Sequence, residues 1–129
     1  ELFGQRNSQG KGKRIVIIED SIVRGTTIRT RIKKLRELGA RELHLRVSCP
    51  PITNPCYYGI DFSSKGELIA ASHSVNDIAR FIGLDSLHFL TVDGLLQAVN
   101  ASGGYCLACF NGHYPELPCQ GHGKMSLEG

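Results

Sequence analysis

A short apolar segment that ends in two acidic residues constrains the fold of this chain more than any other feature. Residues 15–18 are four consecutive β-branched residues, as expected of a strand buried on both faces of a parallel sheet. Glu19 and Asp20 follow directly, and residues 21–27 form a hydroxyl-rich turn around Gly25. This order predicts an α/β fold with a ligand site at the end of the strand, because ligands of open α/β sheets bind there. A helix after the turn is indicated by apolar residues at the spacing of one buried face, namely Ile28, Ile32, Leu35 and Leu38.

The turn and the acidic pair together predict a site for a phosphorylated sugar. The amides from Arg24 to Thr27, and the Thr26 and Thr27 hydroxyls, can donate to a phosphate at the positive end of the helix dipole. The carboxylates of Glu19 and Asp20 can accept hydrogen bonds from sugar hydroxyls. Mg²⁺, which prefers oxygen ligands, would reduce the repulsion between these carboxylates and the phosphate. The alternative is a turn without a ligand, in which the acids cap the helix start and Thr27 is its N-cap.

The remainder of the chain predicts two more strands and several helices. Alternating apolar and polar residues in 42–47 predict a half-buried strand, which completes a βαβ unit after a helix that ends at Gly39. His44 falls on the polar side of this strand, and we expect it on the surface without a partner. Residues 48–62 and 100–115 lack regular periodicity. Further helices are predicted to begin at Ser64, Ser74 and Thr91, with Gly83 as the end of the second and a short strand over 87–90.

Composition and charge argue against several classes of protein. A chain of 129 residues suits one domain, and its formal charge of +3 is modest. No apolar stretch approaches the roughly 20 residues of a membrane span. We interpret residues 1–13 as a flexible lead-in and 119–129 as a disordered tail.

We interpret the basic face of the first helix as solvated, in preference to a nucleic-acid surface; this face carries Arg29, Arg31, Lys33, Lys34 and Arg36.

The five cysteines are the second group of residues with possible chemistry. Their odd number, without a secretion signal, argues against a disulfide framework. Cys106 and Cys109 form a C-x-x-C motif. Its spacing alone leaves open structural thiols, a zinc site with His113 as a third ligand, and an iron–sulfur site. We expect Cys49 to be a buried thiol and Cys119 to be a tail residue without a special role.

The residues around the turn resemble a known signature. The segment I-I-E-D-S-I-V-R-G-T-T is similar to the phosphoribosyl pyrophosphate (PRPP) signature of type I phosphoribosyltransferases, and its D-S-I-V-R-G-T-T form resembles the glutamine PRPP amidotransferases. In that family the position of Glu19 is usually Asp. The resemblance covers about residues 13 to 118 and continues through C-P-P-I-T-N-P-C-Y-Y-G-I-D, E-L-I-A, S-V-N-D-I and C-L-A-C-F. The PRPP-binding residues that it implies are Glu19, Asp20, Ser21, Val23, Arg24, Gly25, Thr26 and Thr27.

The resemblance also implies a fold and an activity. Residues 14–118 would be the C-terminal part of a phosphoribosyltransferase domain, a Rossmann-like parallel sheet followed by an irregular helical segment. The enzyme would be a glycosyltransferase that transfers glutamine-derived ammonia to PRPP, giving 5-phosphoribosylamine in the first step of de novo purine (IMP) biosynthesis. No catalytic residue is expected in this segment. Because no glutaminase domain is recognisable, we expect the chain to be inactive alone. The family further implies a cytoplasmic homo-oligomer that purine nucleotides inhibit.

The cofactors implied by the resemblance are Mg²⁺, at Glu19 and Asp20, and a 4Fe-4S cluster. In one branch of the family four cysteines hold this cluster, and Cys56, Cys106 and Cys109 match three of them. The fourth would lie before the first residue of the sequence. Such a cluster would be structural, because metal–ligand bonds couple metal binding to folding.

Two other classes of protein remain as alternatives. One is a different phosphoribosyltransferase or a PRPP-sensing regulator, against which the C-x-x-C motif argues. The other is a metal-binding or nucleic-acid-binding module built on the cysteines and the basic helix. That module would bind RNA or DNA with a steep dependence on salt.

Overall fold

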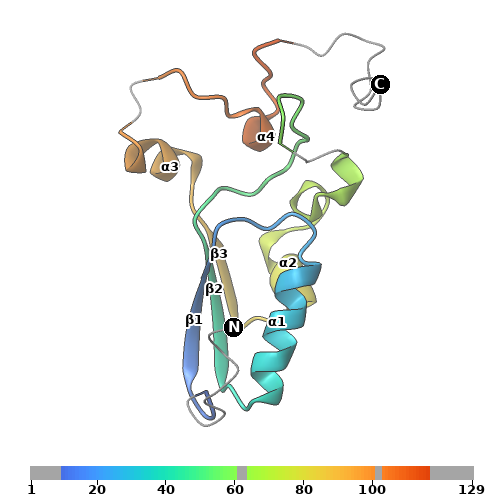
Figure 1. Cartoon of the computed structure of the whole chain (residues 1–129), viewed down its shortest axis with the longest axis vertical. Coiled ribbons are helices and arrows are strands. Elements are labelled where there is room, and N and C mark those ends of the chain that lie inside the picture. The colour runs from blue at the N-terminus through green and yellow to red at the C-terminus, as the bar shows by residue number, and fades with distance from the viewer. Residues whose placement is uncertain (1–9, 61–63, 101–102, 117–129) are drawn as a thin grey trace.

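Among the residues that the structure describes, three parallel strands form one sheet (Figure 1). The computed structural model describes residues 10–60, 64–100 and 103–116. The strand order is β1-β2-β3, and both neighbouring pairs are parallel. The predicted α/β class is therefore confirmed. The strands and the two longer helices are β1 (Arg14–Glu19), α1 (Thr26–Glu37), β2 (Glu42–Val47), α2 (Val75–Ile82) and β3 (Ser86–Phe89).

The core lies on one side of the sheet, where Figure 1 shows both α1 and α2. Leu43 and Leu45 on β2 are 0% exposed, and they pack in one cluster with residues of both helices. On the opposite face, Val16 and Ile18 of β1 are 60% and 70% exposed. The expectation that β1 is buried on both faces is therefore wrong for the described residues. The apolar run of β1 is typical of a central strand, but no described element covers its second face.

Helix α1 begins without a side-chain cap. Gly25 precedes it with a φ of 75°, and its carbonyl accepts the first intrahelical hydrogen bond from Arg29 at 3.0 Å. The alternative in which Thr27 is the N-cap is wrong, since a glycine in the left-handed region already turns the chain into the helix. At the other end Gly39 has a φ of 86°, and its N–H donates to the carbonyl of Arg36. The predicted end of this helix is confirmed.

The later elements follow the predicted caps in two of three cases. The side chains of Ser74 and Thr91 cap α2 and α3 (Val92–Ala98). Ser64 makes no capping bond, and two short 3₁₀ helices replace the single predicted helix. No helix among the described residues is long and apolar enough to cross a membrane. The remaining short elements are η1 (Lys65–Glu67), η2 (Ile69–Ala71) and α4 (Ala108–Asn111), of which the sequence did not predict α4.

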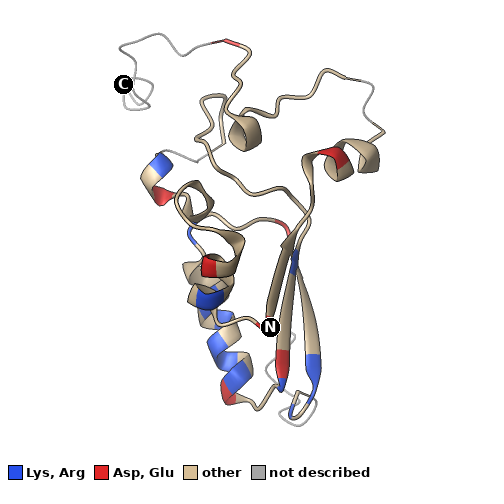
Figure 2. Ribbon diagram, turned by 180° about the vertical axis from the view of Figure 1, so that it is seen from behind, with Lys and Arg blue, Asp and Glu red and all other residues tan. Residues whose placement is uncertain are grey.

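The basic residues of α1 are spread along the helix, as Figure 2 shows. Three of them contact groups of the protein itself. Arg29 lies over the ring of Phe81 at 4.5 Å, Arg31 pairs with a carboxylate of β1, and Arg36 pairs with Asp85. These contacts give three residues of the basic face a structural role, and the interpretation of this face as solvated stays a prediction.

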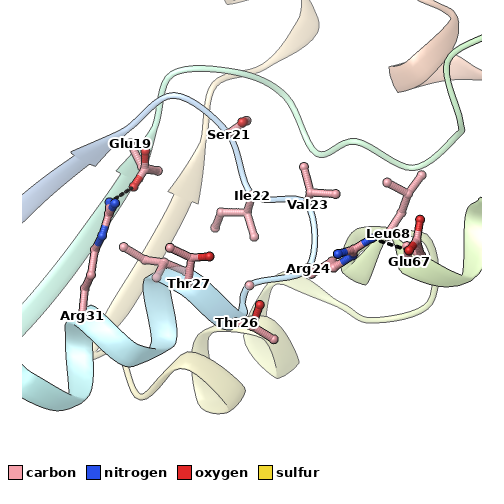
Figure 3. A pocket seen from close by; sticks show the side chains of 12 residues that line it. Glu19, Ser21, Ile22, Val23, Arg24, Thr26, Thr27, Arg31, Glu67 and Leu68 are labelled. Carbon is pink, nitrogen blue, oxygen red and sulfur yellow. Dashed lines mark hydrogen bonds and ion pairs between the residues drawn. The ribbon is translucent and has the colours of Figure 1, made fainter. Parts of the chain in front are cut away.

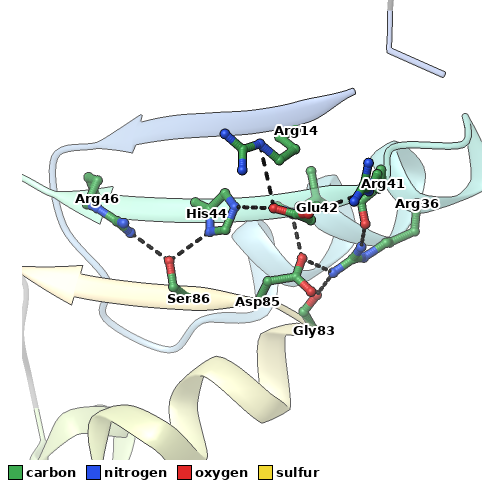
Figure 4. Close-up of polar contacts among 10 residues, drawn as sticks. Arg14, Arg36, Arg41, Glu42, His44, Arg46, Gly83, Asp85 and Ser86 are labelled. Atoms are coloured by element: carbon green, nitrogen blue, oxygen red, sulfur yellow. Dashed lines mark hydrogen bonds and ion pairs between the residues drawn. The ribbon is translucent and has the colours of Figure 1, made fainter. Parts of the chain in front are cut away.

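A polar network joins the strands at the end opposite the turn (Figure 4). The Asp85 carboxylate accepts hydrogen bonds from the backbone N–H of Leu43 and from Arg36, both at 2.6 Å. The Leu43 amide, followed by Arg36, holds the pKa of Asp85 below its usual value. His44 contacts Ser86 at 2.9 Å and Glu42 at 3.2 Å, so the expectation that it lacks a partner is wrong. The sequence did not show the contact with Ser86, because Ser86 comes from another strand; Glu42 lies two residues away on the same side of β2 and was overlooked.

Asp85 predicts an acid-sensitive contribution to stability. Its carboxylate has a lowered pKa in the folded state, so its contribution is present above the ordinary value near 3.8 and is lost as the pH falls through the lowered one. We expect Asp85→Asn to lower the free energy of unfolding by about 1 kcal/mol at pH 7, because the site is partly exposed, and by less at pH 3. Urea unfolding at both pH values measures this difference. Asp93→Asn, at an exposed site, is the control, and an equal loss at both pH values for Asp85→Asn would contradict the prediction.

Candidate functional site

A cavity of about 410 Å³ lies where β1 ends and α1 begins (Figure 3). Of the residues that the sequence predicted for PRPP, all but Asp20 line it; the Asp20 carboxylate instead accepts a hydrogen bond from the Ser21 hydroxyl at 3.0 Å. The structure thus brings most of the signature around one cavity. The lining residues that sequence reasoning did not assign to the site are Ile22, Ile28, Arg31, Glu67 and Leu68.

The turn is held in place by contacts from later parts of the chain. Ile22 is 3% exposed and belongs to the core, and the N–H of Ile69 donates to the carbonyl of Val23 at 2.9 Å. A Cβ atom at Gly25 would lie 3.4 Å from Ile69 and 3.5 Å from Phe81. With its positive φ, this position therefore favours glycine. The first amides of α1 precede the hydrogen bond that the helix makes back to Gly25, so they have no intrahelical acceptor.

Two ion pairs border the cavity, and Figure 3 shows one at each side. Arg31 of α1 contacts Glu19 at 3.2 Å. Arg24 of the turn contacts Glu67 of η1. Sequence reasoning missed both Arg31 and Glu67 as site residues. The E-L-I-A segment was a signal for Glu67, since it belongs to the resemblance, but no local pattern indicated Arg31.

The cysteine segments form a second region, in which the loop after β2 lies against α4. The backbone N–H groups of Thr53 and Asn54 both donate to the carbonyl of Cys109, at 3.0 Å each. The Tyr114 hydroxyl donates to the carbonyl of Pro55 at 2.7 Å, and its ring lies 4.9 Å from that of Tyr57. These contacts place the segment with Cys56 beside the C-x-x-C segment, although the two are far apart in the sequence.

The thiols of this region influence one another. Burial raises the pKa of Cys109, and the neighbouring Cys56 and Cys106 raise it further. Burial also raises the pKa of the half-buried Cys49 to about 11, with smaller effects of Cys109 and Asp20. Cys119 lies outside the described residues, as do residues 1–9 and the rest of the predicted tail.

The described part of the chain contains no group of side chains arranged to bind a single metal ion. No three side chains of His, Cys, Asp or Glu within it are placed to hold one. The zinc alternative, with His113 as a third ligand, therefore gains no support. The predicted Mg²⁺ and iron–sulfur sites stay predictions.

Comparisons with known proteins give relatives over most of this chain. No protein-family model matches the sequence. Curated amidophosphoribosyltransferases from Synechococcus elongatus and Bacillus subtilis are 57% and 54% identical to it over 105 and 110 residues. Each alignment covers 81% of this chain but only 21% and 23% of the relative. The chain therefore spans about a quarter of the length of the curated relatives it matches.

Solved structures agree with these relatives. Glutamine phosphoribosylpyrophosphate amidotransferase from B. subtilis, complexed with ADP and GMP, matches with a TM-score of 0.77 and 51% identity. That match covers 84% of this chain and 25% of the other. A structure described as the allosteric regulatory enzyme of purine biosynthesis has the same TM-score and identity, with 24% of its chain covered.

The sheet, the turn and the solved structures together define part of a type I phosphoribosyltransferase fold. This confirms the predicted fold. Over the matched segment the chain is similar to the amidophosphoribosyltransferases in particular, so the resemblance indicated by its signature is confirmed as well.

Proposed function

We propose that this chain provides the PRPP-binding turn of an amidophosphoribosyltransferase. The observation that carries the proposal is the cavity at the end of β1, because most of the PRPP signature lines it. The similarity to curated amidophosphoribosyltransferases supports the same activity. The reaction would be displacement of pyrophosphate from C1 of PRPP by ammonia, which a glutaminase domain would supply from glutamine.

The residues of the turn would bind and orient the substrate. The free amides at the start of α1, with the hydroxyls of Thr26 and Thr27, would donate to the 5′-phosphate. Glu19 and Asp20 would accept hydrogen bonds from the ribose hydroxyls and hold Mg²⁺, which would offset the negative charge of the substrate. Displacement at C1 passes through an oxocarbenium-like transition state, as in glycoside hydrolysis. These residues would therefore contribute by fixing the geometry at C1 rather than by covalent chemistry.

Calorimetry of PRPP binding in the presence of Mg²⁺ tests the proposal on the full chain. We expect wild-type protein to bind, and Asp20→Asn to weaken binding about tenfold or more, because a hydrogen bond to a charged acceptor is lost. AMP and GMP carry the same 5′-phosphate and ribose, and in this assay we expect them to compete with PRPP. Asp93→Asn, the same change on an exposed part of α3, is the control. Wild-type protein that fails to bind PRPP would overturn the proposal.

We propose that the cysteine region holds an iron–sulfur cluster as a structural group. Cys56, Cys106 and Cys109 come from two segments that backbone hydrogen bonds hold together. Cysteine thiolates are the usual ligands of such clusters. The ligands of a four-iron cluster bind different iron atoms, so they need not meet at the spacing that a single ion requires. We therefore propose these three thiols as cluster ligands that would attach the C-terminal segment to the domain.

A further inference from the structure

Arg31 connects α1 to the first acidic residue of the turn (Figure 3). Its Nη1 lies 3.2 Å from Oε2 of Glu19. The Arg31 side chain is 64% exposed, whereas that of Glu19 is 23% exposed. Both residues line the cavity. The contact is thus part of the cavity wall and leaves the guanidinium accessible to solvent.

The Glu19 carboxylate is held at both oxygens. Oε2 accepts from Arg31, and Oε1 accepts from the backbone N–H of Asp20 at 3.3 Å. Each carboxylate oxygen has two lone pairs, so both can still accept a hydrogen bond from a ligand. A glutamate has one more rotatable bond than an aspartate and loses more conformational freedom when it binds. A contact that fixes the carboxylate beforehand removes part of this cost.

We propose that Arg31 is a positioning residue that holds the Glu19 carboxylate ready for a ribose hydroxyl. It thereby determines how strongly the site prefers a ribose phosphate over a phosphate without sugar hydroxyls. This inference rests on the proposed function, because it takes the turn as the phosphate site and Glu19 as a sugar ligand. Arg31 acts through Glu19 and needs no contact with the substrate.

The other basic residues of α1 do not share this arrangement. Arg36 forms an ion pair with Asp85 at the far end of the helix, and Arg29 lies over the ring of Phe81. Lys34 is exposed and does not line the cavity. Lys34→Gln therefore removes the same charge from the same helix and serves as the matched control for Arg31→Gln.

The test compares three ligands by calorimetry with Mg²⁺ on the full chain: ribose 5-phosphate, 2,3-dideoxyribose 5-phosphate and inorganic phosphate. We expect Arg31→Gln to reduce the preference for ribose phosphate over dideoxyribose phosphate about fivefold or more. Without Arg31 the Glu19 carboxylate is no longer held in position to accept a hydrogen bond from the ribose. The affinity for inorganic phosphate should fall no more in Arg31→Gln than in Lys34→Gln. Arg31→Lys keeps the charge and should restore part of the preference.

A double-mutant cycle separates positioning from direct contact. In a Glu19→Gln background, Arg31→Gln should have no further effect on the preference, because its partner is already gone. An equal effect in both backgrounds, or a loss of inorganic phosphate binding beyond that of Lys34→Gln, would show direct contact with the ligand and overturn the proposal. An unchanged preference in Arg31→Gln would overturn it as well. If wild-type protein binds neither PRPP nor ribose 5-phosphate, the proposed function fails first and this inference falls with it.

Discussion

Replacing Leu45 by alanine is expected to lower the free energy of unfolding by about 3 kcal/mol or more. Leu45 is 0% exposed at the centre of β2, between β1 and β3. Truncation of such a leucine removes its burial and leaves a cavity, which typically costs 2–5 kcal/mol. That is a large part of the roughly 5–15 kcal/mol that stabilises a typical domain. Urea unfolding followed by circular dichroism measures the shift of the midpoint.

Val16→Ala is the matched control for this prediction. Val16 lies on the neighbouring strand β1 but is 60% exposed on the face opposite the helices. We expect it to cost less than about 1 kcal/mol, because little of its surface leaves water on folding. Comparable losses in the two variants would contradict the one-sided core and would show that Val16 is covered in solution.

The alternation within β2 made this core predictable from sequence. Leu43 and Leu45 fall on one side of the strand by periodicity alone, and the structure places both against the helices. The same reasoning was wrong for residues 15–18. A continuous apolar run shows that a strand can be covered on both faces, but the covering itself depends on elements elsewhere. Of residues 15–18, only Ile15 and Ile17 pack against the core.

The candidate site was predictable to the extent that its parts are contiguous in the chain. The strand, the acidic pair and the glycine turn are local, so their order alone placed them at one cavity. Arg31 and Glu67 were missed because each pairs with a residue 12 or 43 positions away. Such contacts depend on the orientation of α1 and η1 relative to the turn, which the spacing of residues does not specify.

The cysteines show the same limit in another form. Their spacing assigned Cys106 and Cys109 to one motif, but only the resemblance assigned Cys56 to the same site. The structure supplies the physical connection, because the carbonyl of Cys109 accepts the amides of Thr53 and Asn54 just before Cys56. The sequence could not show this bond, since the loop after β2 has no periodicity from which to derive it.

Serine in place of Cys109 is expected to remove nearly all of the iron that the protein takes up. Anaerobic incubation with ferric iron, sulfide and a thiol should load the wild-type chain, because the thiol reduces part of the iron and can serve as the fourth ligand. Iron and acid-labile sulfide are then counted per chain. Cys109 connects the two segments of the proposed ligand set, because its carbonyl accepts the amides of Thr53 and Asn54, and both Cys56 and Cys106 raise its pKa. A serine hydroxyl is a poor ligand for iron in such clusters, which cysteine thiolates hold.

Cys49→Ser is the control that makes this result specific. Cys49 is half-buried and also lies near Cys109, but it is outside the proposed ligand set. We expect this variant to keep the iron content of the wild type. Loss of iron in Cys49→Ser would replace one proposed ligand, and full iron in Cys109→Ser would remove the cluster from the proposal. Loss in Cys109→Ser alone would support Cys109 as a cluster ligand, because the two variants make the same change and differ only in which thiol is removed.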